Sequence, residues 1–304
     1  MTKSIVVGVD PFHDNPGPLE LAGLLARATG ATVVAVAAHP HESHATQSAS
    51  PAFERAVADA AEAALRDVPA ALDGVAVTTL AIPASSPARA LYDVAQEHDG
   101  GIIVVGSKHG GAIGRLLPGG VTDQVLNGAA CPVAVAPHGF RFGGPAPRRV
   151  GVAFVDTPEG RDALRGGLAL ASRCDASVRA ITLVEPIIVA PAAGMSGAAW
   201  AEVPLDEARS SQRAAVAAVA GDVPVVCEVI DGRSSTLAEA SAGFDVLVCG
   251  SRGYGPVKTV LLGSVSHRLA RTARCPLIVL PRGSEGTLEA LLEAPATASN
   301  AAGG

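Results

Sequence analysis

The chain has 304 residues and a formal net charge of −6, and 3% of its residues are aromatic. This length suggests about two domains, and an acidic chain with few aromatic side chains lacks the basic surface and stacking platforms of a nucleic-acid-binding protein. No run approaches the roughly 20 apolar residues that span a membrane, and the residues after Met1 lack the features of a signal peptide. Five dispersed cysteines without a Cys-x-x-Cys pair indicate reduced thiols. We therefore expect a cytoplasmic protein that binds neither nucleic acid nor membrane.

Short apolar runs alternate with amphipathic segments along the first half of the chain. The apolar runs predict strands at 5–9, 32–37, 75–82, 102–105 and 133–136. The segments between them predict helices at 19–29, 52–67, 87–97 and 121–128. Because unbroken β-branched runs linked by helices favour a sheet that is covered on both faces, this order indicates a parallel α/β unit.

The second half repeats the same order of elements. It predicts strands at 150–155, 178–184, 223–230, 246–249 and 277–280, and helices at 161–174, 206–220, 235–242 and 265–272. We predict the α/β class: two tandem Rossmann-like domains, each a five-stranded parallel sheet with helices on both faces. The domains are expected at 1–140 and 148–282, joined by a linker at 141–147. The tail at 283–304 is expected to be disordered apart from a transient helical turn at 288–292.

A Gly-x2-Gly-x9-Gly-Ser string follows the predicted strand at 246–249. It consists of Gly250, Gly253, Gly263 and Ser264, and a predicted helix begins directly after it. Glycine allows a backbone to approach a ligand closely, and the free N–H groups of a helix N-terminus attract anions. The string therefore predicts a nucleotide phosphate site. The alternative is a tight turn in which the glycines serve packing alone.

An altered copy of this string occurs in the first half. With a shift of 144 in residue number, 106–137 aligns without a gap on 250–281, which indicates an internal duplication of a whole domain. Gly106 and Gly119 match Gly250 and Gly263, but His109 stands at the place of Gly253 and Gly120 at the place of Ser264. The second copy is thus the better phosphate binder, and the first is degraded or specialised.

This spacing resembles the ATP-binding motif of the universal stress protein family, and the sequence Cys-Pro-Leu-Ile-Val at 275–279 resembles that family's last strand. The resemblance extends nearly to Arg282 and is to the tandem, actinobacterial type. It implies ATP as the ligand, with or without Mg²⁺. It also implies that the domains pair through their last strands, here the matching segments 131–137 and 275–281 within one chain. A homodimer of such chains is the further assembly considered.

The resemblance also implies the residues that line the two nucleotide sites. In the first half these are Gly8, Val9, Asp10, Ala38, Gly106, His109, Gly119 and Gly120. In the second half they are Ala153, Phe154, Asp156, Val184, Gly250, Arg252, Gly253, Gly263, Ser264, Val265 and Ser266. Asp10 matches the family's nucleotide-contacting Asp at the end of the first strand, and its alternative role is that of a turn or capping residue.

The second half departs from the family at this Asp. Val155 holds the position, and Asp156 follows one residue late. Because successive strand side chains point to opposite faces, Asp156 can substitute only if the strand end bulges or turns. Each half therefore keeps the part that the other has lost.

Two clusters of charged or ligating side chains invite other interpretations. Arg268, Arg271 and Arg274 lie toward the end of a predicted helix, where cations complement the helix dipole; a partner surface is the alternative. His39, His41 and His44 form a short cluster that has no counterpart in the second half, and we predict no metal site.

The function expected from these features is that of a non-enzymatic, ATP-binding regulator of stress or dormancy responses that acts on an unknown protein partner. No catalytic residue is assigned, because the sequence has neither a P-loop nor paired carboxylates for phosphoryl transfer. The alternatives are a nucleotide-independent interaction scaffold of the same fold and a slow ATPase.

Overall fold

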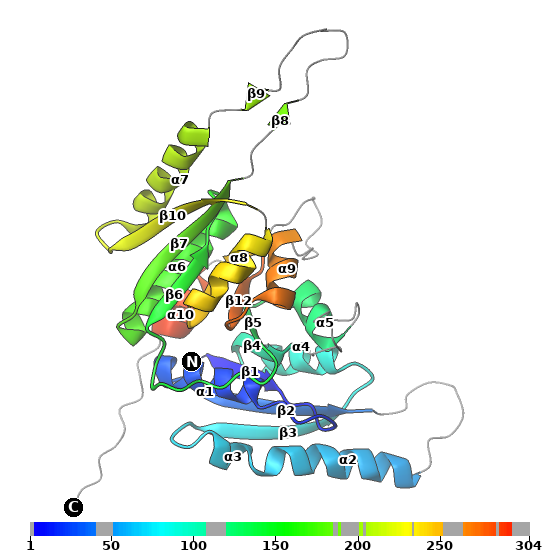
Figure 1. The fold of residues 1–304 in the computed structure, drawn as a ribbon. Coiled ribbons are helices and arrows are strands. Elements are labelled where there is room, and N and C mark those ends of the chain that lie inside the picture. Colours follow the sequence, from blue (N-terminus) through cyan, green and yellow to red (C-terminus); the bar gives the residue numbers. More distant parts are fainter. Residues whose placement is uncertain are drawn as a thin grey trace, which may run out of the picture.

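A computed structural model describes residues 3–40, 51–107, 120–184, 188–189, 201–202, 205–232, 234–251, 264–283 and 286–293 (Figure 1). The first half runs β1 (Ser4–Gly8), α1 (Gly17–Thr29), β2 (Val33–His39), α2 (Pro51–Arg66), α3 (Val68–Ala71), β3 (Val77–Pro83), α4 (Pro87–Glu97), β4 (Gly100–Gly106), α5 (Val121–Gly128) and β5 (Val133–Ala136). Every predicted element of this half is present, and the short helix α3 is an addition that the sequence did not indicate.

The second half repeats this order with two insertions. It runs β6 (Arg149–Ala153), α6 (Pro158–Cys174), β7 (Ser177–Val184), β8 (Ile188–Val189), β9 (Ala201–Glu202), α7 (Leu205–Ala220), β10 (Val225–Asp231), α8 (Ser234–Ala240), the 3₁₀ turn η1 (Ser241–Gly243), β11 (Val246–Gly250), α9 (Ser264–Thr272), β12 (Leu277–Leu280) and α10 (Thr287–Glu293). The additions are the small antiparallel pair β8–β9 and the helix α10. The predicted α/β class is confirmed.

The strands form one ten-stranded sheet in the order β10-β7-β6-β11-β12-β5-β4-β1-β2-β3. Each half is parallel within itself, as predicted. The halves join at its centre, where β12 pairs antiparallel with β5 through Leu277 opposite Val135 and Ile278 opposite Ala134. The last strands therefore pair within one chain, and each covers the apolar edge that the other would expose.

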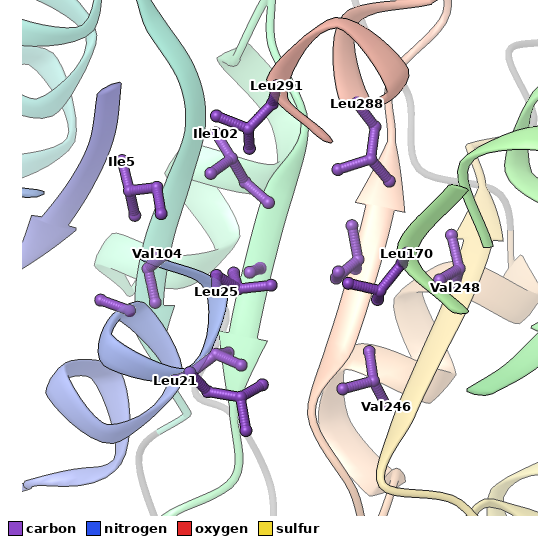
Figure 2. Close-up of a cluster of buried hydrophobic side chains, with 14 of the residues drawn as sticks. Ile5, Leu21, Leu25, Ile102, Val104, Leu170, Val246, Val248, Leu288 and Leu291 are labelled. Atoms are coloured by element: carbon purple, nitrogen blue, oxygen red, sulfur yellow. The ribbon is translucent and has the colours of Figure 1, made fainter. Parts of the chain in front are cut away.

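Helices cover both faces of the sheet and bury two cores (Figure 1). The first core lies beneath α1, α2, α6, α7 and α10 and is continuous across both halves. In Figure 2, Leu21 and Leu25 of α1 lie on the side of Ile5 and Val104, and Leu170 of α6 lies beside Val248. The second core lies beneath α4, α5, α8 and α9. The two halves thus share a packed interior.

Helix α10 corrects the prediction of a disordered tail. Leu288, Leu291 and Leu292 are at most 2% exposed and belong to the first core. Figure 2 shows Leu291 beside Ile102 of the first half, with Leu288 on the side of Leu170 of the second half. The prediction is wrong for Thr287–Glu293 because these leucines find an apolar seam built by residues far away in the sequence. Residues 294–304 lie outside the described chain.

Candidate functional site

The strand order creates one topological switch point in each half. The order reverses between β1 and β4 in the first half and between β6 and β11 in the second. Val7 lies opposite Val104 in one pair and Val152 opposite Val248 in the other, so the carboxyl ends of each pair meet at one edge. Open parallel sheets bind ligands at such switch points. The two glycine strings begin at these edges, at the ends of β4 and β11.

In the second half, Gly250 is required by packing. A Cβ atom on Gly250 would lie 2.6 Å from the carbonyl oxygen of Glu159, in the first turn of α6. Only glycine allows the end of β11 to approach this backbone so closely. The packing alternative therefore holds for Gly250. Arg252, Gly253 and Gly263 of the same string lie outside the described residues.

Ser251 is a candidate ligand contact that the sequence prediction missed. It is 1% exposed, and its N–H donates to the carbonyl of Leu280 at 2.8 Å. Its buried Oγ has no hydrogen-bond partner in the described part of the chain. A buried hydroxyl without a partner is costly, so one at the start of the glycine string is a candidate donor to a ligand oxygen. The available signal was a Ser after the first Gly in both copies, Ser107 and Ser251.

The helix that follows the second string begins at Ser264, as predicted. The first turn of α9 carries no acidic residue, whereas the first turn of α5 carries Asp123. A carboxylate at this position compensates the positive end of the helix dipole and repels an incoming phosphate. Val265 is partly buried against the second core, and Ser266 is 3% exposed. The electrostatics at the helix N-termini therefore favour anion binding in the second half.

The first half brings its predicted residues Gly8, Val9, Asp10, Ala38, Gly106 and Gly120 to one edge of the sheet. Gly106 is held there because a Cβ would lie 2.6 Å from Nδ2 of Asn15, and Thr122 Oγ1 of α5 donates to its carbonyl at 2.6 Å. Gly120 caps α5 without a side-chain hydrogen bond. His109 and Gly119 lie outside the described residues.

Asp10 forms a turn at this edge. Its carboxylate accepts the Phe12 N–H and a hydrogen bond with His13 Nδ1, each at 3.0 Å. This is the turn role that was the alternative to nucleotide contact. Asp10 nevertheless lies two residues after the end of β1, the strand end at which the resemblance places a ligand.

Asp156 does not take the place of the missing Asp in the second half. Its carboxylate accepts a hydrogen bond from Arg161 Nε at 2.6 Å, and its N–H donates to Gln212 Oε1 of α7 at 3.2 Å. The chain turns here because the Thr157 N–H donates to the Val155 carbonyl at 2.7 Å. Asp156 thus lies on the α6–α7 side of the sheet, whereas α9 packs on the other side. Its predicted nucleotide contact is not supported by this geometry.

The remaining predicted residues of the second half differ in how far they are buried and in where they lie relative to the switch point. Ala153 is partly buried and lies opposite Cys249, at the carboxyl end of the β6–β11 pair. Phe154 is 1% exposed and its side chain belongs to the first core, so only its backbone can face a ligand. Val184 is the last residue of β7. Burial raises the pKa of the Cys249 thiol to about 12, so this cysteine stays protonated at neutral pH.

The described residues contain no group of three or more His, Cys, Asp or Glu side chains that could hold a metal ion. His39 ends β2, while His41 and His44 lie outside the described residues. Among the helices that the structure describes, none combines the length and the apolar character needed to cross a membrane.

Two Rossmann-like domains, each with a strand-to-helix glycine string at its switch point, define a tandem α/β protein. A model of the universal stress protein family matches residues 1–137 and 147–281, so the chain belongs to this family. A universal stress protein of Mycobacterium tuberculosis is 28% identical over 295 residues, covering 91% of this chain and 99% of the relative. A second from that organism is 30% identical over 200 residues, covering 64% and 66%.

Solved structures of the same family share this fold. A universal stress protein from Archaeoglobus fulgidus has a TM-score of 0.68 at 17% identity, covering 91% of this chain and 98% of that one. A putative universal stress protein from Pseudomonas aeruginosa has a TM-score of 0.61 at 19% identity, covering 96% and 97%. The tandem arrangement is therefore shared along nearly the whole chain.

Proposed function

We propose that this universal stress protein is a regulatory protein of stress or dormancy responses that binds ATP in its second half and does not act as an enzyme. The observation that carries the proposal is the placement of the Gly250–Ser264 string. Gly250 ends β11 beside the switch point, Ser264 begins α9, and α9 has no carboxylate in its first turn. Glycine backbone, a serine hydroxyl and a helix N-terminus are the groups that suit phosphate oxygens.

The residues that would hold the triphosphate are Gly253, Gly263 and Ser264, together with the hydroxyl of Ser251. Mg²⁺ would enter with the phosphates, as it usually does when few protein ligands are present. The nucleotide would act by favouring one state of the protein, since a ligand shifts an equilibrium only through its differential affinity for two states. A protein partner would bind that state selectively.

A nucleotide-independent scaffold is the second candidate function. It is favoured by one observation, the replacement of the family's Asp by Val155 while Asp156 is engaged by Arg161. A scaffold would bind its partner equally well with and without nucleotide. The two candidates therefore differ in whether ATP binds at all.

Calorimetric titration of MgATP into the wild type, Gly263→Asp and Gly119→Asp tests the proposal. Asp at 263 puts bulk and negative charge against the phosphates, and Asp at 119 does the same at the equivalent position of the first half. We expect one site that is lost in Gly263→Asp and retained in Gly119→Asp. The opposite pattern would move the site to the first half. An absence of binding to folded wild type, repeated with a fluorescent ATP analogue, would favour the scaffold.

Turnover is tested separately by following phosphate release from ATP over hours. We expect wild type to release phosphate no faster than Gly263→Asp does. A faster release that Gly263→Asp abolishes would replace the non-enzymatic part of the proposal with slow ATP hydrolysis.

A further inference from the structure

Three arginines gather at the end of α9. Arg268 and Arg271 lie in the helix, and Arg274 follows it by two residues. Arg268 and Arg274 are exposed and Arg271 is partly exposed. Within the described residues, none of the three guanidinium groups makes an ion pair or a side-chain hydrogen bond. We call these three side chains the α9 arginine face.

Helix α5 shows that the fold does not require this charge. It occupies the equivalent position in the first half and packs into the same core through Val125 and Leu126, as α9 does through Leu269 and Ala270. At the positions of the three arginines it carries Gln124, Asn127 and Ala130, and it has no basic residue in its last turn. Complementing the helix dipole is therefore not a condition for folding this unit. The charge on α9 requires another explanation.

We propose that the α9 arginine face is a docking surface for an acidic segment of a partner protein. Arg268 and Arg271 are three residues apart on the helix and so are separated by a rise of about 4.5 Å, and Arg274 follows beyond the helix end. Each planar guanidinium can hold a carboxylate through two parallel N–H donors. A segment with several closely spaced carboxylates would provide a partner for each of them. This proposal does not depend on nucleotide binding.

A protein segment fits this surface better than a nucleic acid or a membrane does. Nucleic acids and anionic bilayers present charge over an area much larger than one helix. The chain as a whole carries a net charge of −6, which would oppose such an extended anion. A short acidic segment, in contrast, touches the arginine face and little else.

The test measures binding of a fluorescein-labelled peptide with four Glu-Ala-Ala repeats, by fluorescence polarisation at 50 mM salt. The matched peptide carries Gln in place of Glu. One variant, Arg268→Gln/Arg271→Asn/Arg274→Ala, places the α5 residues on α9. The control variant, Arg55→Gln/Arg66→Gln/Arg213→Gln, removes the same charge from exposed arginines of α2 and α7. Circular dichroism establishes that both variants are folded.

We expect the full-length wild type to bind the Glu peptide about tenfold more tightly than the Gln peptide, with affinity falling as salt rises. The α9 variant should lose this preference, and the dispersed control should keep it within about twofold. Equal losses in both variants, or equal affinity for both peptides, would overturn the proposal. Tighter binding of oligo-dT or of phosphatidylserine vesicles, abolished by the α9 variant, would also overturn it by assigning the face to another class of partner.

Discussion

The two halves of this protein share one arrangement of strands and helices and differ in the residues that follow the strand ends. Both hold five parallel strands in the same order, and in both a glycine at the end of the fourth strand packs against the first helix. The residues beyond that glycine diverge. The first half keeps Asp10 at the strand end and puts Asp123 in the first turn of α5, whereas the second has Val155, no acidic residue in the first turn of α9, and the arginine face. The duplication thus preserved what packing requires and varied what a ligand or partner would meet.

The segments that follow the last strand of each half also differ in form, although both pack against the first core. After β5, Phe140 and Phe142 pack against the first core, and Arg141 pairs with Glu20 of α1 at 3.7 Å. After β12, α10 covers the core, and Glu289 pairs with Arg165 of α6 at 3.6 Å. An irregular segment in one half and a helix in the other therefore both add apolar side chains to the first core.

The largest expected effect comes from disrupting the packing of α10 against the first core. Leu291 is 0% exposed, and Leu291→Asp would bury an unpaired charge where the two halves share a core. We expect a loss of about 4 kcal/mol or more in the free energy of unfolding, measured by urea denaturation. The neighbouring substitution Ala290→Ser, on the exposed side of α10, should change it by less than about 0.5 kcal/mol. A folded Leu291→Asp protein with wild-type stability would show that α10 is not part of the core.

Gly250→Ala should reveal a difference between the two strand ends. Its Cβ would meet the backbone oxygen of Glu159 at 2.6 Å, which cannot move without shifting α6. We expect a cost of about 3 kcal/mol in urea denaturation. Gly106→Ala meets the Nδ2 atom of Asn15, which can rotate away, although Pro18 at 2.9 Å is less free to move. A cost of about 1 kcal/mol follows for this variant.

Gly243→Ala is the control for this pair, because its Cβ would meet no atom within 4 Å. It should change the midpoint of denaturation least. If Gly250→Ala proves as mild as Gly243→Ala, close packing is not the reason for glycine at 250.

Asp245 ties the start of β6 to β11 in a way the first half lacks. Its carboxylate accepts from the N–H groups of Arg148 and Arg149 at 2.8 and 3.0 Å and from the Arg149 guanidinium at 2.9 Å. Burial acts to raise the pKa of Asp245, but these hydrogen bonds outweigh it and hold the pKa below its usual range. Asp245→Asn should cost about 2 kcal/mol at neutral pH. At the equivalent edge of the first half, Ser4 Oγ donates to the His98 carbonyl instead.

The lowered pKa of Asp245 determines how its contribution to stability changes with pH. A carboxylate whose folded pKa is lowered stabilises the protein fully above its unfolded pKa and loses that contribution as the pH falls through the folded pKa. Thermal melts of wild type and Asp245→Asn should therefore differ at pH 7 and converge on acidification below about pH 4. A difference that stays constant down to pH 3 would rule out the charged form as its source.

The smallest effect concerns the contact at the pseudo-two-fold axis. Asp123 and His267 are equivalent residues of the two copies, and they face one another with 3.9 Å between Asp123 Oδ1 and His267 Nε2. His267→Asp would oppose two carboxylates and should cost about 0.5 to 1 kcal/mol at low salt. Exchanging both residues should restore the loss in a double-mutant cycle measured by thermal melting. A double exchange no better than the single variant would mean that the two side chains do not interact.

The sequence by itself determined most of the strands and helices of the two repeats. Periodic apolar runs predicted all ten strands of the main sheet and the helices between them except α3, and the predictions for β5, β12, α4 and α5 coincide with the observed bounds. The internal alignment and its family resemblance further predicted that the last strands pair within one chain. These features could be predicted because a strand or helix that buries one face carries apolar side chains at a regular local spacing.

Only the tertiary structure decided the positions that depend on distant neighbours. It turned Asp156 toward Arg161 and Gln212, left the Ser251 hydroxyl buried without a partner among the described residues, and set Asp123 opposite His267. It also gave the leucines of α10 a seam to fill. A sequence pattern states which side of an element is apolar, but it does not state which remote residue will face a given side chain once the sheet has closed.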